Sequence, residues 1–330
     1  MTDAPGADGP ASRVAQGLHE PLQRALHAVF GPEGVRVSAP LAPLTTFHVG
    51  GAADYLVEAH QADQLVAAAR IAREHGVPLT VLGGGSNVLV SDRGIRGVVV
   101  LARDREVTQV DARGVRAAAG LTINGLVRWT IGRGLAALEA WAGTPGTVGG
   151  AIHGNAHFQG RLIGDLVREV RVLMPDGIVR DVAAADMGFA YDVSRLQGSG
   201  EVALSAVFDV TTGEPEALRR TARESLAFRK RTQPLDVPSA GCIFQNPDPA
   251  RERVPDGIPP SAGALIDRAG LKGSTVGEAR VSPTHGNFIV HDGRASAADI
   301  RGLIERCKDA VATRFGVQLR EEIVYLGEFD

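Results

Sequence analysis

The sequence contains few of the residues that mark several common classes of protein. Only two of its 330 residues are cysteines, Cys242 and Cys307, too few for the disulfide framework of a small secreted domain. No apolar run approaches the roughly 18 residues of a membrane span. Residues 1–13 lack the basic and apolar regions of a signal peptide. We therefore expect a cytoplasmic protein with free thiols, a disordered tail over residues 1–15 and no membrane contact.

Charge and composition narrow the expected partners further. The net charge of -3 leaves no basic surplus for binding nucleic acid. Only three of the 35 basic residues are lysines, so each lysine is worth inspecting: Lys230, Lys272 and Lys308. Hydrophobic residues make up 44% and charged residues 22%, as in globular proteins. The length allows two or three domains, and we expect no metal site.

Apolar periodicity predicts an α+β protein. Residues 55–102 have the strand, helix and strand pattern of a βαβ unit. Residues 167–182 form two alternating runs around Pro-Asp-Gly, which predicts a hairpin. After Gly213 the pattern changes to helices with two further strands. The predicted helices cover 13–30, 62–76, 122–134, 214–231, 260–270 and 296–316, and the predicted strands lie within 55–59, 77–82, 97–102, 106–120, 167–182, 201–211, 287–293 and 318–327.

Three glycine-rich stretches expose backbone amides, at 45–51, 82–94 and 143–156. Glycine tolerates positive φ and lets a ligand approach the backbone closely, and successive amides form a concave site for anions. One such loop alone is as consistent with a tight turn. Three of them, with hydroxyl and amide side chains alongside, favour a large phosphorylated cofactor. Neither the dinucleotide fingerprint GxGxxG nor a P-loop is present.

Several motifs resemble one known family. "TTFHVGG", "LGGGSNVLV", "TPGTVGG", "PSAGCIFQNP" and "LREEIVYLG" are similar, in order and spacing, to the UDP-N-acetylenolpyruvoylglucosamine reductase (MurB) family, over residues 41–327. The resemblance implies a two-lobed FAD-binding domain of the vanillyl-alcohol-oxidase type and a smaller α/β substrate-binding domain. It also implies that FAD takes a hydride from NADPH and reduces UDP-N-acetylglucosamine enolpyruvate to UDP-N-acetylmuramate, a precursor of peptidoglycan.

The resemblance also implies domain boundaries and ligand contacts. The FAD-binding domain would cover 16–213, with lobes at about 41–102 and 103–213. The substrate-binding domain would cover 214–330, its last strand returning to the active site. The implied FAD contacts are Thr46, Gly50, Leu82, Gly83, Gly84, Gly85, Ser86, Asn87, Leu89, Gly120, Thr144, Pro145, Gly146, Thr147, Gly149, Gly150 and Asn155.

Three residues are implied to act in catalysis. Cys242 stands where the family carries its proton donor, usually a serine, and a protonated thiol suits that task. Glu322, the last acid of "LREE", matches the second catalytic group. Asp192 stands at the position of an arginine in the family pattern Tyr-Arg-x-Ser. The implied substrate contacts are Tyr191, Arg231, Ser239, Asn246, Lys272, His285 and Asn287.

The sequence departs from the family at two places. Asp192 would repel the substrate carboxylate that the arginine attracts, unless another arginine such as Arg195 substitutes for it. His157 and Phe158 would reshape the flavin pocket. The short segment after Tyr191 matches the shorter subclass of the family. Two alternatives follow: a flavin oxidoreductase with another substrate, or a catalytically inactive flavoprotein that binds UDP-sugars. We expect a monomer.

Overall fold

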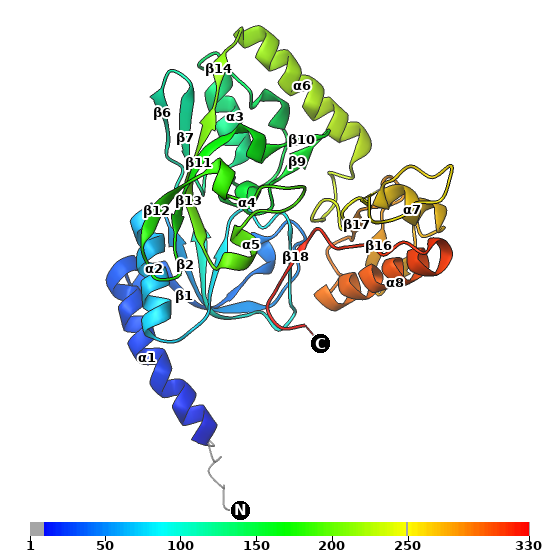
Figure 1. The fold of residues 1–330 in the computed structure, drawn as a ribbon. Coiled ribbons are helices and arrows are strands. Elements are labelled where there is room, and N and C mark those ends of the chain that lie inside the picture. Colours follow the sequence, from blue (N-terminus) through cyan, green and yellow to red (C-terminus); the bar gives the residue numbers. More distant parts are fainter. Residues whose placement is uncertain (1–9, 249, 330) are drawn as a thin grey trace, which may run out of the picture.

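The computed structural model describes residues 10–248 and 250–329, with side chains from residue 20 onward. Two lobes, each built on a sheet, are stacked one above the other in Figure 1, and a smaller part lies beside them. None of the helices in these residues combines the length and apolar character needed to cross a bilayer.

The first lobe is a four-stranded sheet, in the order β1-β2-β5-β3, with α1 and α2 packed on one face. Strands β2, β5 and β3 are parallel, and β1 pairs antiparallel with β2. Val98 and Val100 of β5 face the helices, whereas Val99 and Leu101 enter a separate core on the other face. Burial on both faces explains the unbroken apolar run of β5. The elements are α1 (Pro10–Phe30), β1 (Val35–Pro40), β2 (Ala52–Ala59), α2 (Ala62–Glu74), β3 (Leu79–Leu82) and β5 (Ile95–Ala102).

The second lobe is an antiparallel five-stranded sheet, in the order β12-β11-β13-β7-β6. Helices α3 and α4 cover one face, and the core between them contains the fully buried rings of Trp141 and Phe208. The elements are β6 (Val107–Asp111), β7 (Gly114–Ala118), α3 (Ile123–Ile131), β8 (Leu135–Ala136), α4 (Val148–His153), β9 (His157–Phe158), β10 (Arg161–Leu162), β11 (Val167–Leu173), β12 (Val179–Ala183), α5 (Leu196–Ser199), β13 (Val202–Asp209) and β14 (Thr211–Thr212).

Helix α6 (Pro215–Thr232) corrects the expected domain boundary. The sequence placed a boundary at Gly213 and assigned this helix to the substrate-binding domain. In the structure Leu218 and Ala222 are buried in the core of the second lobe, and α6 lies across the top of that lobe (Figure 1). The boundary therefore follows α6, because its apolar face is covered by the second lobe.

The third part packs α7 (Ala262–Arg268) and α8 (Ala297–Phe315) with the three-stranded sheet β15-β16-β17. Cys307 of α8 is fully buried in this core, as expected for a packing residue. Phe47 and Leu89, from the first lobe, are buried in the same core and join the two parts. The strands are β15 (Thr275–Val276), β16 (Ala279–Val281) and β17 (Ile289–Val290).

The C-terminal strand β18 (Val324–Leu326) returns to the first lobe. It pairs in parallel with β4 (Val88–Val90), which lies within the second glycine-rich stretch. The chain therefore crosses from the third part back to the glycine loops just before it ends (Figure 1).

The long predicted elements are confirmed, and the differences lie mainly in short ones. Strands β1 and β4 were not predicted, because β1 is a half-exposed edge strand and β4 has only three residues inside a glycine loop. Helix α1 begins at Pro10, so residues 10–15 of the expected disordered tail are helical. The rest of that tail, residues 1–9, lies outside the described residues.

Asp92 connects the first lobe to the third part. Its carboxylate accepts hydrogen bonds from the backbone amides of Ala297 (2.9 Å) and Ala298 (3.0 Å), the first residues of α8. Carboxylates at a helix N-terminus satisfy free amides and the helix dipole. Asp92→Ala should lower the free energy of unfolding by about 0.5–2 kcal/mol, measured by urea denaturation. Asp63→Ala is the control, because Asp63 lies in the first turn of α2 and belongs to a helix of the first lobe alone. An equal or larger loss of unfolding free energy in Asp63→Ala would contradict the claim that Asp92 stabilises the contact between the first lobe and the third part.

Candidate active site

Two glycine loops approach each other so closely that side chains would not fit between them. A Cβ atom on Gly84 would lie 2.8 Å from the Cα of Gly146. Gly146 itself has a φ of 95°, which non-glycine residues rarely adopt. The third loop joins them, because the amide of Thr46 donates to the carbonyl of Gly85 (3.0 Å). The three stretches that the sequence singled out therefore meet at one place.

The loops leave a buried donor without a protein partner. The hydroxyl of Thr147 is buried and has no hydrogen-bond partner within residues 10–248 and 250–329. The hydroxyl of Ser86 lies beside Gly146 at the same junction. An unpaired buried hydroxyl among packed backbone amides is what a bound anion would satisfy. The residues therefore fit a flavin dinucleotide, whose pyrophosphate would lie against them.

The predicted FAD contacts differ in what they can offer a ligand. The contacts at the loop junction stay predictions: Thr46, Gly83, Gly84, Gly85, Ser86, Asn87, Thr144, Pro145, Gly146, Thr147, Gly149 and Gly150. Some of their donors already have protein partners, since the amides of Thr46, Thr144 and Gly149 donate to backbone carbonyls. Gly50 and Gly120 pack tightly against Val90 and Ala102, and Leu82 is buried at the end of β3.

Two of the predicted FAD contacts, Leu89 and Asn155, stay predictions, but their side chains are fully buried. Leu89 is fully buried in the core of the third part. Asn155 is also fully buried, and its side chain bridges two loops: its Nδ2 donates to the carbonyl of Ala190 (2.7 Å), and its Oδ1 accepts from the amide of Gly164 (2.9 Å). Both side chains serve packing, which motif spacing does not distinguish from binding.

Cys242 lies in a loop held by backbone and amide contacts. The side chain of Asn287 accepts from the amide of Phe244 (2.9 Å) and donates to its carbonyl (2.7 Å). The amide of Glu322 donates to the carbonyl of Ile243 (2.7 Å). Asn287 was predicted to bind substrate, which stays a prediction; in the structure its side chain is buried and positions the Cys242 loop.

Burial sets the protonation of the two predicted catalytic groups. It raises the pKa of the Cys242 thiol, and the nearby charges of Glu322 and Asp192 raise it further against the opposing charge of Arg229. Burial also raises the pKa of Glu322 to about 8, and the charge of Asp192 adds to this. Both groups therefore carry protons at neutral pH, so the site contains two potential proton donors.

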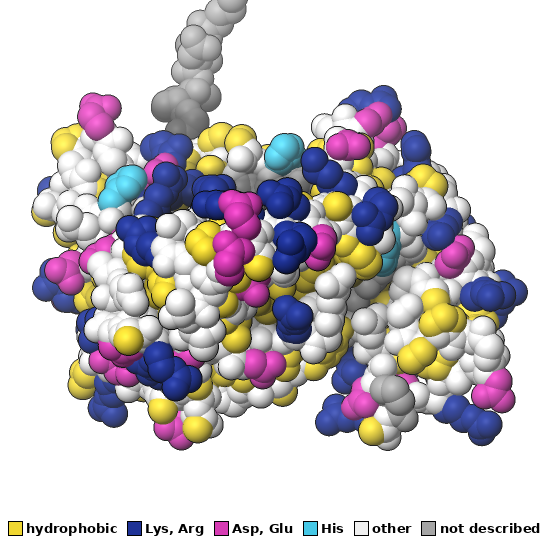
Figure 2. Space-filling model, turned by 90° about the horizontal axis from the view of Figure 1, so that it is seen from above, with side chains coloured by type: hydrophobic (Ala, Val, Ile, Leu, Met, Phe, Trp, Pro, Cys, Tyr) yellow, Lys and Arg dark blue, Asp and Glu magenta, His cyan; other side chains and the backbone are white. Residues whose placement is uncertain are grey.

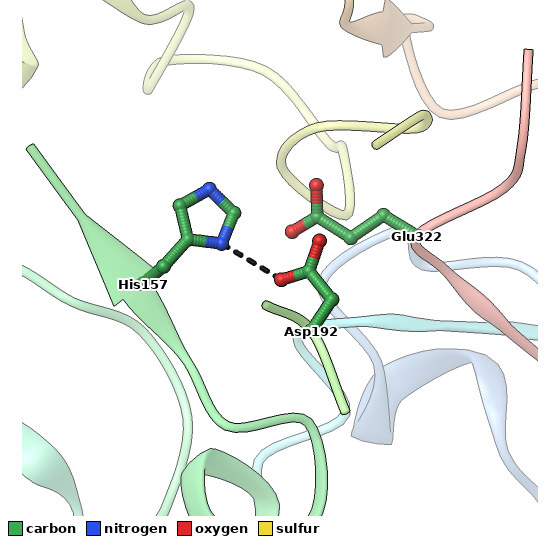
Figure 3. A group of neighbouring side chains, drawn as sticks. All are labelled: His157, Asp192 and Glu322. Atoms are coloured by element: carbon green, nitrogen blue, oxygen red, sulfur yellow. Dashed lines mark hydrogen bonds and ion pairs between the residues drawn. The ribbon is translucent and has the colours of Figure 1, made fainter. Parts of the chain in front are cut away.

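Asp192 faces Glu322 and His157 (Figure 3). Its Oδ1 lies 2.7 Å from Nδ1 of His157, and the Asp192 side chain is only 7% exposed. The pKa of His157 is raised: burial lowers it, but the hydrogen bond and charge of Asp192 and the charge of Glu322 outweigh that effect. The Asp192 carboxylate therefore favours the protonated form of the imidazole it contacts.

The three side chains also offer ligand atoms that all lie within 4.8 Å of one another. A metal ion would need these atoms free to point at one centre. In this structure Nδ1 of His157 is instead engaged directly with the Asp192 carboxylate.

Arg195 does not substitute for the arginine missing at position 192. Its guanidinium forms an ion pair with the buried carboxylate of Glu201, at 2.5 Å, and donates to the carbonyl of Asp186. These partners hold it away from the acid–base group. The hypothesis that Arg195 takes over the position is wrong, because it already neutralises another buried charge.

Arg229 is the site residue that sequence reasoning missed. Its Nη2 donates to the hydroxyl of Thr144 (2.7 Å), and its guanidinium stacks 3.8 Å from the ring centre of Phe158. Burial lowers its pKa to about 10. Arg229 shares the buried face of α6 with Leu218, Ala222 and Ser225, at helical spacing. An arginine at a position where the spacing predicts burial could have identified this residue from the sequence.

The predicted substrate contacts line the third part and the junction. Tyr191 is 40% exposed, and Nδ2 of Asn246 donates to its hydroxyl at 3.4 Å. Lys272 forms an ion pair with Asp267 at 2.9 Å. The pKa of His285 is lowered by burial and by the charge of Lys272. The backbone amide of Ser239 donates a hydrogen bond to the carbonyl of Thr46. Arg231 is exposed at the end of α6.

Seen from above, a cleft separates the lobes from the third part, and Lys and Arg side chains gather along its lobe side (Figure 2). The exposed basic residues of α6 are Arg219, Arg220, Arg223, Lys230 and Arg231.

The fold and the loops define a class of protein. Two lobes whose glycine loops meet around an unsatisfied buried hydroxyl, beside a smaller domain that supplies a thiol, suit an FAD-binding oxidoreductase, and the family models agree. A model of the FAD binding domain matches residues 53–183, and a model of the UDP-N-acetylenolpyruvoylglucosamine reductase C-terminal domain matches residues 233–326. The second match begins directly after α6.

Full-length relatives give the family. The chain is 39% identical over 291 residues to UDP-N-acetylenolpyruvoylglucosamine reductase of Heliobacterium modesticaldum, covering 88% of this chain and 90% of that protein. It is 40% identical to the reductase of Nostoc sp., covering 89% and 87%. The crystal structure of the reductase from Thermus caldophilus matches with a TM-score of 0.72 at 33% identity, covering 88% and 98%. The chain belongs to the UDP-N-acetylenolpyruvoylglucosamine reductase family.

The contact between the glycine loops gives a test of the cofactor site. Gly84→Ala should push residues 84 and 146 apart and reduce the FAD retained on purification at least tenfold, because the added carbon would overlap backbone that cannot rotate away. The ratio of flavin to protein absorbance measures this. Gly198→Ala is the control, since no atom lies within 4 Å of its Cβ position; full flavin content in Gly84→Ala would contradict the site.

The raised pKa of Glu322 predicts how stability depends on pH. Between the ordinary value of 4.5 and about 8, the folded state binds a proton that the unfolded state has lost, so stability falls as pH rises through that window. Glu322→Gln should therefore be more stable than the parent at pH 9, by roughly 1–3 kcal/mol, and equal to it near pH 4. Urea denaturation of the holoprotein measures the difference; Glu224→Gln on exposed α6 should show no such trend.

Proposed function

We propose that the protein catalyses the NADPH-dependent reduction of UDP-N-acetylglucosamine enolpyruvate to UDP-N-acetylmuramate. The observation that carries the proposal is the meeting of the protonated Cys242 and Glu322 beside the glycine-lined loops. We further propose that it acts in the cytoplasm as a monomer, in the synthesis of peptidoglycan precursors.

The reaction adds a hydride to one carbon of the enolpyruvyl double bond and a proton to the other. Bound FAD would supply the hydride, which it takes from NADPH. Cys242 would supply the proton through its Sγ, since burial and its acidic neighbours keep that thiol protonated. The loop contacts of Asn287 fix the position from which the proton is given.

Glu322 would stabilise the negative charge that develops on the substrate carboxylate. A protonated carboxyl group donates a hydrogen bond without adding a second negative charge. Its backbone is fixed on both sides, because Nδ2 of Asn87 donates to its carbonyl (3.0 Å) and its own amide donates to Ile243 (2.7 Å). This preorganises the donor before the substrate arrives.

The remaining predicted contacts would bind the nucleotide sugar. Tyr191 and Asn246 already approach each other across the cleft, so one substrate group between them would contact both domains. Lys272, His285 and Ser239 line the third part. Lys272 and Arg231 would meet the two phosphates as charged donors.

Removing the thiol tests the role of Cys242. Wild-type protein should oxidise NADPH only when the enolpyruvyl substrate is present. Cys242→Ala should keep the bleaching of flavin absorbance by NADPH but slow its reoxidation by substrate by roughly 10²- to 10⁴-fold, because the general acid is lost. Stopped-flow absorbance measures both half-reactions.

Two further variants make this test specific. Cys242→Ser retains a proton donor of similar size and should keep most of the activity that the alanine variant loses. Cys307→Ala removes the other thiol, far from the site in the core of the third part, and should leave both half-reactions unchanged. Normal reoxidation in Cys242→Ala would contradict the proposed role.

A further inference from the structure

The segments that carry His157 and Asp192 are tied to each other. The turn at residues 190–193 closes on itself through two backbone hydrogen bonds between Ala190 and Val193 (3.0 and 3.1 Å). Asn155 donates to the carbonyl of Ala190, and the hydroxyl of Ser194 donates to the carbonyl of His153, each at 2.7 Å. Because both ends of this turn are anchored to the segment around β9, the two side chains are held at a fixed separation.

Asp192 adopts a conformation that its surroundings impose. Its φ is 55°, a left-handed value that costs energy for most residues and persists only where neighbouring contacts determine it. Its carbonyl accepts from Nε2 of Gln197 (2.8 Å), and its Oδ1 engages Nδ1 of His157 (2.7 Å). The other carboxylate oxygen, Oδ2, is buried without a hydrogen-bond partner. This geometry directs the carboxylate at the imidazole ring.

The contact with Asp192 determines which end of His157 is open. With Nδ1 occupied, Nε2 lies 3.4 Å from the hydroxyl of Tyr191, a weak contact, and the two rings are 4.7 Å apart. Tyr191 is 40% exposed and borders Asn246 of the third part. Nε2 therefore points toward the side of the site where a substrate would enter between the two domains.

Among the side chains of the site, His157 is the one best suited to contact the substrate carboxylate. Cys242 and Glu322 stay protonated, and Asp192 carries a negative charge that would repel the substrate carboxylate. Arg229 is committed to Thr144 and to the ring of Phe158. The titratable and charged groups that face His157 from the elements packed around it are Asp192 and Tyr191 of the turn, Glu322 before β18 and Arg229 of α6.

We propose that His157 is a further substrate-contacting residue: its Nε2–H donates to the carboxylate of the enolpyruvyl group, and Asp192 is its positioning residue. The proposal rests on the proposed function, because that function supplies the carboxylate. It explains how an aspartate is accommodated at position 192: Asp192 orients and charges an imidazole that meets the anion in its place. No covalent step is involved, since the interaction is a charge-assisted hydrogen bond.

Comparing two ligands measures how much the carboxylate of the enolpyruvyl group contributes to binding. His157→Gln should weaken binding of UDP-N-acetylglucosamine enolpyruvate roughly 10- to 100-fold, the loss expected for one hydrogen bond to a charged group. It should leave binding of UDP-N-acetylglucosamine, which lacks the carboxylate, unchanged. Isothermal titration calorimetry of the FAD-loaded variants, with EDTA present throughout, gives both dissociation constants. His60→Gln, at an exposed histidine beside Glu58, is the matched control and should change neither.

The pH dependence separates positioning from general structural damage. In wild-type protein the dissociation constant for the enolpyruvyl ligand should rise as pH passes above the raised pKa of His157. Asp192→Asn keeps an oxygen acceptor but removes the charge, so the same rise should occur at lower pH. Titration of the His157 ring by NMR in the ligand-free protein should show the matching decrease in its pKa.

Different outcomes would overturn different claims. Equal loss of affinity for both ligands in His157→Gln, or an unchanged pH profile in Asp192→Asn, would overturn the role of His157. Binding that disappears with EDTA in the wild-type protein would also overturn it, since a metal ion would then supply the positive charge. A wild-type protein that binds the enolpyruvyl ligand but oxidises no NADPH with it would overturn the proposed function and leave the binding comparison valid.

Discussion

The backbone of Glu322 is the contact on which the arrangement of the site depends. Its amide donates a hydrogen bond to the carbonyl of Ile243, in the Cys242 loop of the third part. Its carbonyl accepts a hydrogen bond from Nδ2 of Asn87, in the glycine loop of the first lobe. β18 then continues into a parallel pair with β4. One short segment thus fixes the distance between the cofactor loops and the proton donor. Buried backbone groups must be paired, so the segment cannot shift without losing bonds on both sides.

Environment gives the acidic groups of the site different roles. Glu322 and Cys242 are half-buried, and loss of solvation raises the pKa of each against the opposing charges of His157 on Glu322 and of Arg229 on Cys242. Oδ1 of Asp192 lies 2.7 Å from Nδ1 of His157, and this contact raises the pKa of the imidazole. The site therefore combines two groups that hold a proton more tightly than usual with a carboxylate that faces a histidine. The contact with His157 also offsets the repulsion expected between Asp192 and the substrate carboxylate.

The cofactor loops depend on small residues more than on polar ones. Gly84 and Gly146 allow two backbones to approach within a distance that excludes any side chain. Thr147 then has a buried hydroxyl with no protein partner. By contrast, Asn155, a polar residue in the same motif, is used entirely to hold two loops together. The motifs therefore mark the loops that meet here, but they do not separate side chains that could contact a ligand from side chains already engaged within the protein.

The sequence alone determined the α+β class, the long helices and strands, the three glycine loops and, through motif resemblance, the family and Cys242. These features depend on local periodicity and on residue types that only certain backbones accept. The tertiary structure decided which lobe covers α6, which arginine reaches the site and which histidine meets Asp192. Those choices depend on packing between segments distant in sequence, such as Arg229 against Thr144, and no local pattern encodes such distances.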